Sequence, residues 1–177
     1  MGGCGGTWYI ACSRAATGTE WRGNRRRQDC LNVVGPLGQS VSLPTQGVSW
    51  VLVGGGYGSA PMFMLAQALR ERGCRVDMII GASTEDRLFG VLELKRLASA
   101  LTITTDDGSS GVRGTVTDVL DNVLQRAGAD VVYACGPMPM LSEVARISTT
   151  RRVYRAVPYT HLARPTTPQV WSAGVGG

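Results

Sequence analysis

The chain reads WVLVGGGYGSAP from Trp50 to Pro61. The first four of these residues form a short apolar run, which is typical of a strand buried on both faces of a sheet. The glycines that follow allow a tight turn and let backbone N–H groups approach an anionic ligand. Residues 60–72 then have helical composition and end at Gly73, a suitable C-cap. This order indicates a nucleotide-binding α/β unit; a glycine-rich turn that binds nothing is the alternative.

The alternation of strand and helix continues along the chain. Strands are predicted at residues 50–53, 75–81, 101–105 and 130–134, and helices at residues 60–72, 86–100, 116–127 and 137–147. Such alternation implies right-handed crossovers and a mainly parallel sheet covered on both faces, which is a doubly wound α/β fold. The ligand of such a fold is expected beyond the carboxyl ends of the strands.

Charge is distributed unevenly over the 177 residues. The net charge is +5, yet residues 48–147 carry 9 Lys and Arg against 11 Asp and Glu, so the positive charge lies in the flanks. A nucleic-acid-binding protein would need a basic stripe on its folded surface, and we expect no nucleic-acid partner. The uncharged run from Cys30 to Leu69 is interrupted by glycine and proline, so we expect no membrane span.

The five cysteines show no C-x-x-C spacing, and the single histidine, His161, lies far from all of them in sequence. We therefore expect no metal ligands and no iron–sulfur cluster in this chain. An odd number of cysteines and a Gly-rich start without an apolar signal segment predict reduced thiols and a cytoplasmic location.

Four motifs occur in a fixed order. Residues 51–69 read VLVGGGYGSAPMFMLAQAL, residues 81–83 read GAS, residues 105–114 read TDDGSSGVRG, and residues 134–141 read ACGPMPML. Together they resemble the NAD-binding half of the ferredoxin-reductase superfamily, most closely the electron-transfer subunits of bacterial dihydroorotate dehydrogenase. One difference is that Ser83 replaces the arginine of that family's G-A-R segment.

The resemblance implies hydride and electron transfer between NAD(H) and FAD, with the protein positioning the two cofactors. It implies as cofactor-binding residues Gly18, Thr19, Gly54, Gly55, Gly56, Gly58, Pro61, Glu85, Asp107, Cys135, Gly136 and Pro137. Cys135 would lie near the nicotinamide and is the candidate catalytic residue, although we assign it no role as a nucleophile. A small buried thiol that packs the strand end is the alternative.

Acidic residues follow the second predicted strand. Glu85 and Asp86 are candidates to accept hydrogen bonds from the adenosine ribose, and their charge would repel a 2′-phosphate, which favours NAD over NADP. A solvated loop or a helix N-cap is the alternative for both. Asp107 is followed by Gly108, and Asp-Gly is also a strong turn signal.

Two parts of the family pattern are absent, the R-x-Y/F-S flavin motif and the Cys-rich loop that ligates a [2Fe–2S] cluster. We therefore divide the chain into a remnant of the flavin-binding barrel with a connector (1–47), the NAD-binding domain (48–147) and an irregular tail (148–177). Residues 159–162 resemble translated sequencing-adapter sequence, so the tail receives no functional role. Stable FAD binding and cluster binding are not expected of this chain.

The favoured function is that of an NAD-linked flavoprotein oxidoreductase subunit in pyrimidine biosynthesis, with the catalytic dihydroorotate dehydrogenase subunit as its partner. Another flavin or hydrogenase-associated reductase of the superfamily, or a redox-silent NAD-binding fragment, is the alternative. An unrelated Rossmann dehydrogenase would need a catalytic Tyr/Lys or His/Asp set. The single lysine, Lys95, and the single histidine, His161, do not provide one.

Overall fold

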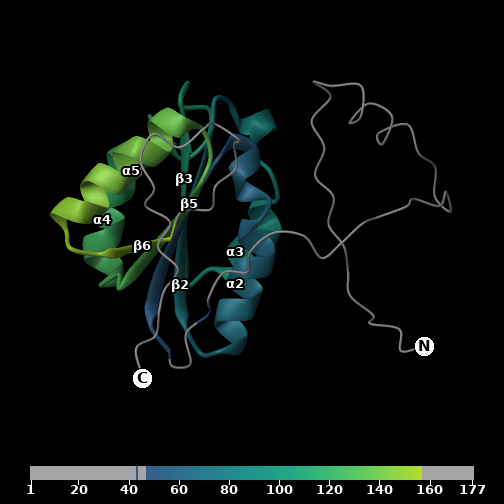
Figure 1. The fold of residues 1–177 in the computed structure, drawn as a ribbon. Coiled ribbons are helices and arrows are strands. Elements are labelled where there is room, and N and C mark those ends of the chain that lie inside the picture. Colours follow the sequence, from purple (N-terminus) through teal and green to yellow (C-terminus); the bar gives the residue numbers. More distant parts are fainter. Residues whose placement is uncertain (1–42, 44–46, 157–177) are drawn as a thin grey trace, which may run out of the picture. The chain divides into compact units, whose positions relative to one another are not determined.

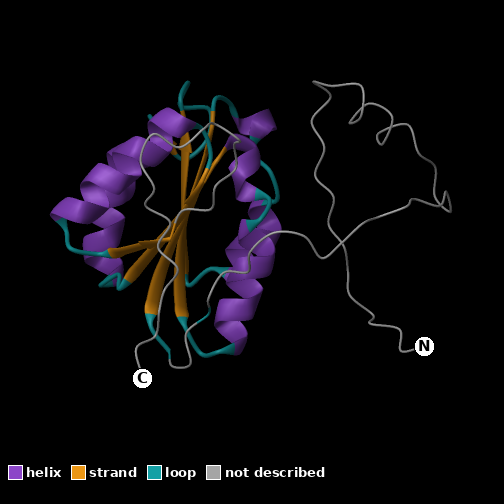
Figure 2. Ribbon diagram, in the orientation of Figure 1, coloured by secondary structure: helices purple, strands orange, loops and turns teal. Residues whose placement is uncertain are grey.

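The computed structural model describes residue 43 and residues 47–156. This part of the chain forms a six-stranded sheet with helices on both faces (Figures 1 and 2). The strand order is β4-β3-β2-β1-β5-β6, and every neighbouring pair is parallel. The prediction of a doubly wound α/β domain is therefore confirmed. The predicted barrel remnant falls almost wholly outside the described residues.

The first strand, β1, lies inside the sheet, and the later strands extend the sheet on both sides of it. The strands are β1 (Ser49–Gly55), β2 (Arg75–Ala82), β3 (Ala100–Thr105), β4 (Val112–Arg113), β5 (Val131–Cys135) and β6 (Tyr154–Ala156). The α-helices are α2 (Met62–Glu71), α3 (Val91–Leu97), α4 (Val116–Ala127) and α5 (Met138–Thr150), and two 3-10 helices are η1 (Gly56–Ser59) and η2 (Glu85–Arg87). Strands β2, β3 and β4 extend one side of β1, whereas β5 and β6 extend the other. The order thus reverses between β1 and β5, which is the topological switch point of the sheet.

Alternate residues of the central strand face opposite layers of helices. Figure 1 shows α4 and α5 on one face of the sheet and α2 and α3 on the other. Val51 and Val53 belong to the buried cluster that includes the apolar sides of α4 and α5. Leu52 is fully buried and, because side chains alternate along a strand, points to the opposite face. Burial on both faces explains why β1 reads as a continuous apolar run.

The second predicted helix differs most from the structure. The prediction of a helix over residues 86–100 is wrong for most of that range, since α3 covers only Val91–Leu97. Gly90 has a left-handed φ of 66° at the N-cap, so the chain turns before the helix begins. At the other end, the Ser99 N–H donates to the Val76 carbonyl at 2.6 Å and leads into β3.

The carboxyl end of the described chain contains more secondary structure than the sequence predicts. Helix α5 extends beyond the predicted end at residue 147, to Thr150. Residues 154–156 then form β6, which was not predicted and pairs with β5 from Val131 to Tyr133. Residues 157–177, the rest of the predicted tail, lie outside the described residues. Over the described ranges, no helix has both the length and the apolar character needed to cross a bilayer.

Candidate nucleotide-binding site

The predicted motifs meet at the carboxyl edge of the sheet. In the parallel register, Gly54 lies opposite Cys135 and Gly55 lies opposite Gly81. The ends of β1, β5 and β2 are therefore level with one another. Ligands of doubly wound folds bind beside the switch point at this edge, so the edge formed by these strand ends is the candidate site.

The glycine turn after β1 packs directly on the end of β5. A Cβ atom on Gly58 would lie 2.0 Å from the Cys135 carbonyl oxygen and 3.0 Å from the Gly136 nitrogen. A Cβ atom on Gly54 would lie 2.8 Å from the Cα atom of Ser59. Both contacts are with backbone or Cα atoms that cannot rotate away. The turn can pack closely, on itself and on the end of β5, because Gly54 and Gly58 have no side chains.

Gly56 is needed for a different reason. Its φ is +57°, and a Cβ atom there would meet nothing within 4 Å, so the constraint is conformational rather than steric. The turn is fastened by Ser59, whose buried hydroxyl donates to the Gly56 carbonyl at 2.9 Å. The Tyr57 side chain between them is 73% exposed. The turn therefore presents backbone and one aromatic ring to the solvent side of the site.

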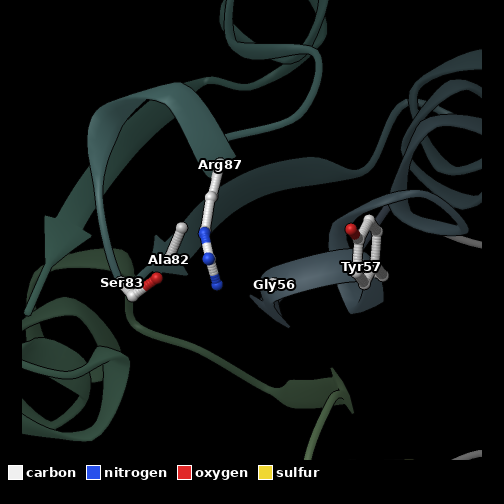
Figure 3. A pocket seen from close by; sticks show the side chains of 5 residues that line it. All are labelled: Gly56, Tyr57, Ala82, Ser83 and Arg87. Carbon is white, nitrogen blue, oxygen red and sulfur yellow. The ribbon is translucent and has the colours of Figure 1, made fainter. Parts of the chain in front are cut away.

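A pocket of about 130 Å³ lies between the ends of β1 and β2. Enclosed sites for drug-sized ligands measure roughly 300–1,000 Å³, so this pocket can hold one part of a dinucleotide. In Figure 3 the Arg87 side chain extends between Ser83 and Gly56, with the Ser83 hydroxyl directed toward its guanidinium. The pocket is lined by Gly56, Tyr57, Ala82, Ser83 and Arg87. Of the predicted cofactor-binding residues, it includes Gly56.

The two acidic residues after β2 lie beside this pocket without lining it. The Asp86 carboxylate accepts a hydrogen bond from the Thr84 hydroxyl at 2.5 Å. Glu85 is exposed, and its backbone N–H donates to the Ser109 hydroxyl at 2.8 Å. A contact between Glu85 and a ribose stays a prediction.

Asp107 fastens the turn after β3. Its carboxylate accepts hydrogen bonds from the Ser109 hydroxyl at 2.6 Å and from the Ser109 N–H at 3.0 Å. These hydrogen bonds hold the pKa of Asp107 below its ordinary value. Because Ser109 also accepts from Glu85, this serine joins the loops that follow β2 and β3. A contact between Asp107 and the nucleotide stays a prediction.

Cys135 ends β5 and is buried at 6% exposure. Burial raises the pKa of its thiol, since a thiolate would lose its hydration there. At neutral pH the side chain is thus a neutral thiol rather than a reactive thiolate. It lies next to the glycine turn, but its catalytic role stays a prediction.

The remaining predicted residues frame the same edge. Gly136 closely approaches the turn, since its added Cβ atom would lie 3.3 Å from the Gly55 Cα atom. Pro61 is the N-cap of α2, and Pro137 is the N-cap of α5 rather than part of its first turn. The predicted flavin contacts, Gly18 and Thr19, lie outside the described residues.

Within residues 47–156, no three His, Cys, Asp or Glu side chains lie close enough together to hold a metal ion. Two buried cysteines are described. Cys74 precedes β2 and Cys135 ends β5. Because the strands are parallel, Cys74 lies at their amino ends and Cys135 at their carboxyl ends.

The charged and aromatic side chains of the pocket, Arg87 and Tyr57, were not predicted from the sequence. Tyr57 stands inside the glycine motif, and its position was the available signal. Arg87 gave none, because the side chain returns to the pocket through the 3-10 turn η2.

Comparison with known proteins bears on this geometry. Residues 52–146 match the family model described as the oxidoreductase NAD-binding domain. The chain belongs to this family. The matched range begins in β1 and ends in α5, so it includes the turn, the pocket and the end of β5 that form the site.

Relatives of this NAD-binding domain include two proteins named as electron-transfer subunits. The dihydroorotate dehydrogenase B (NAD(+)) electron transfer subunit homolog of Thermotoga maritima is 40% identical over 111 residues, 63% of this chain and 39% of that protein. The corresponding subunit of Bacillus caldolyticus is 37% identical over 151 residues, 84% of this chain and 58% of that protein. The chain therefore spans about half the length of these relatives.

A solved structure shares the fold and part of the sequence. It is the NADH-dependent reduced ferredoxin-NADP oxidoreductase, described in connection with flavin-based electron bifurcation. The likeness has a TM-score of 0.69 at 34% identity and covers 78% of this chain and 50% of that one.

Proposed function

We propose that this chain is the nucleotide-binding part of an electron-transfer subunit that links dihydroorotate oxidation to NAD through a flavin. The observation that carries the proposal is the contact between the glycine turn and the end of β5 at the switch point, where Gly58 meets the backbone of Cys135. The names of the two relatives, with 40% and 37% identity to this chain, support the choice of reaction.

The described residues fit a dinucleotide. The glycine turn leaves a cradle that a Cβ atom at Gly58 would disrupt, and the adjoining pocket contains one cationic side chain, Arg87. Backbone N–H groups and positive charge are the features that bind a pyrophosphate. NAD(H) supplies the hydride chemistry when bound. The predicted FAD contacts, Gly18 and Thr19, lie outside the described residues.

In this proposal the chain acts by positioning. The turn from Gly54 to Gly58 holds the pyrophosphate, and the switch point directs one half of the dinucleotide toward β5 and the other toward β2. The end of β5 then orients the nicotinamide, since Cys135 and Gly136 offer a small side chain and backbone there. Positioning of this kind accounts for a large part of catalysis in bimolecular transfer.

The neutral thiol of Cys135 suits this role. The oxidised nicotinamide ring carries a positive charge that the reduced ring lacks. A thiolate beside it would stabilise the oxidised form, whereas the raised pKa of Cys135 keeps the side chain uncharged. The contact therefore favours neither redox form through charge, which suits transfer in both directions.

The proposal is tested by mixing the full chain with a bacterial catalytic dihydroorotate dehydrogenase subunit and an excess of free FAD, because stable FAD binding is not expected of this chain. NADH formation from dihydroorotate and NAD+ is followed by the absorbance of the reduced nicotinamide. We expect NADH formation that requires both polypeptides. The control omits this chain. NADH binding without NADH formation would instead favour a redox-silent nucleotide-binding domain, and the assigned reaction would be abandoned.

A second candidate is electron transfer in a ferredoxin-dependent complex. The solved structure with a TM-score of 0.69 favours it, because that protein is named for its reaction with ferredoxin. The same assay with reduced ferredoxin in place of dihydroorotate separates the two candidates. NADH formation from ferredoxin alone would favour the second.

A further inference from the structure

We propose that Ser83 and Arg87 bind the 2′-phosphate of NADPH, so that this chain accepts the phosphorylated nucleotide as well as NADH. This inference rests on the proposed function, because it assumes that a dinucleotide occupies the carboxyl edge of the sheet. It concerns the pocket between β1 and β2. Among the predicted cofactor-binding residues that the structure describes, Gly56 alone lines this pocket.

The charge of this pocket comes from one arginine. Arg87 lines the pocket, and its guanidinium extends toward Ser83 (Figure 3). The three ion pairs between described residues involve other arginines and leave Arg87 without a carboxylate partner in that part of the chain. A planar guanidinium with several donors matches the oxygens of a phosphate group, and a serine hydroxyl can donate to the same group. The pocket is therefore suited to a phosphate.

The acidic residues nearby do not oppose this assignment. The Asp86 carboxylate accepts from Thr84, and Glu85 is exposed outside the pocket lining. The expectation that these carboxylates repel a 2′-phosphate depended on their facing the ribose. Instead, the residue that faces the pocket from η2 is the third member of that turn, Arg87.

Position along the edge distinguishes the 2′-phosphate from the pyrophosphate. The glycine turn follows β1, whereas Ser83 and Arg87 follow β2, the next strand outward from the switch point. Neighbouring strands lie about 4.8 Å apart. A dinucleotide with its nicotinamide at β5 and its pyrophosphate at β1 thus carries its adenosine ribose to the end of β2. The ribose 2′ position then meets Ser83 and Arg87.

Calorimetric titration of the full chain with NADH and NADPH tests the proposal, using wild type, Arg87→Gln and Ser83→Ala. Arg96→Gln is the matched control, because Arg96 is exposed on α3 and does not line the pocket. We expect wild type to bind NADPH at least as tightly as NADH. Loss of charge-assisted hydrogen bonds in Arg87→Gln should weaken NADPH binding about 10- to 100-fold and NADH binding less than about 3-fold. Ser83→Ala should weaken NADPH binding to a smaller extent.

Adenosine 2′,5′-bisphosphate and 5′-AMP provide a second readout, since they differ by the 2′-phosphate alone. Arg87→Gln should weaken binding of the bisphosphate selectively. Equal weakening of NADH and NADPH would overturn the proposal and place Arg87 on the shared pyrophosphate. Unchanged affinities in Arg87→Gln would also overturn it, while leaving the proposed function intact. If wild type binds neither dinucleotide, both the proposed function and this inference fail.

Discussion

Replacing Gly58 by alanine tests whether the glycine turn must contact the end of β5. The new Cβ atom would lie 2.0 Å from the Cys135 carbonyl oxygen and 2.5 Å from its carbonyl carbon. Carbon–oxygen contacts ordinarily measure about 3.3 Å or more, so the turn and the strand must separate by roughly 1 Å. Gly58 is not among the residues with positive φ, and alanine therefore adds no backbone strain there.

We expect two effects of Gly58→Ala. Overpacking at a rigid contact costs about 1–3 kcal/mol of the free energy of unfolding, to be measured by urea denaturation. Displacing the turn from a bound pyrophosphate should also weaken NADH binding about 10-fold or more, as measured by calorimetry.

Gly128→Ala is the control for stability alone. Gly128 has a φ of +57° and no atom within 4 Å of the added Cβ atom, and it lies at the C-cap of α4. The left-handed backbone makes this change cost about 1–2 kcal/mol, with NADH affinity unchanged. If Gly58→Ala binds NADH as tightly as Gly128→Ala does, the contact between turn and strand has no role in nucleotide binding.

Three further changes address the core, the thiol and the loop network. Leu120→Ala removes a fully buried side chain from the core beneath α4. Urea denaturation should show that the free energy of unfolding falls by about 2–5 kcal/mol. A loss under about 1 kcal/mol would contradict this packing. The raised pKa of Cys135 leaves little thiolate at pH about 8. Peptide mass spectrometry should therefore show that iodoacetamide alkylates Cys135 more slowly than free cysteine, and more slowly still when NADH is bound. Rapid labelling of Cys135 would be inconsistent with its burial. Ser109→Ala removes the acceptor of the Glu85 N–H and the hydroxyl donor to Asp107. Hydrogen exchange of the Glu85 amide should therefore accelerate, and the pKa of Asp107 should rise. Unchanged exchange would show that the hydrogen bond between Glu85 and Ser109 does not persist in solution.

The sequence predicted the central strands well because their signals are local. β1 is a continuous apolar run that begins and ends within two residues of the predicted limits, and α4 matches residues 116–127. Its apolar residues recur at helical spacing, and Gly128 ends the helix with a left-handed φ of 57°. Periodicity and glycine together are sufficient in these elements.

The wrong or missing elements depend on tertiary contacts. The predicted helix over residues 86–100 has suitable composition, but Gly90 adopts φ 66° and Ser99 bonds to β2. Strand β4 has two residues and β6 has three, so neither provides a periodic pattern. Both become strands because a neighbouring strand offers unpaired backbone groups.

The candidate site was predicted in its location and only partly in its residues. Motif order placed the glycine turn and Cys135 at one edge, and the register confirms that Gly54 lies opposite Cys135. Residue type alone favoured Glu85 as the group facing the ribose. The direction of a long side chain is set by the 3-10 turn that bears it, and this turn directs Arg87 into the pocket.

Binding of a dinucleotide at the carboxyl edge of the sheet is tested by hydrogen exchange of the full chain with and without saturating NADH. We predict slower exchange at residues 54–58, at residues 82–87 and at residues 135–136, which surround the switch point and the adjoining pocket. The opposite edge, around Gly73 and Arg75, should exchange at the same rate in both samples. No change at any of these segments, or protection confined to the opposite edge, would show that NADH does not bind at the carboxyl edge of the sheet.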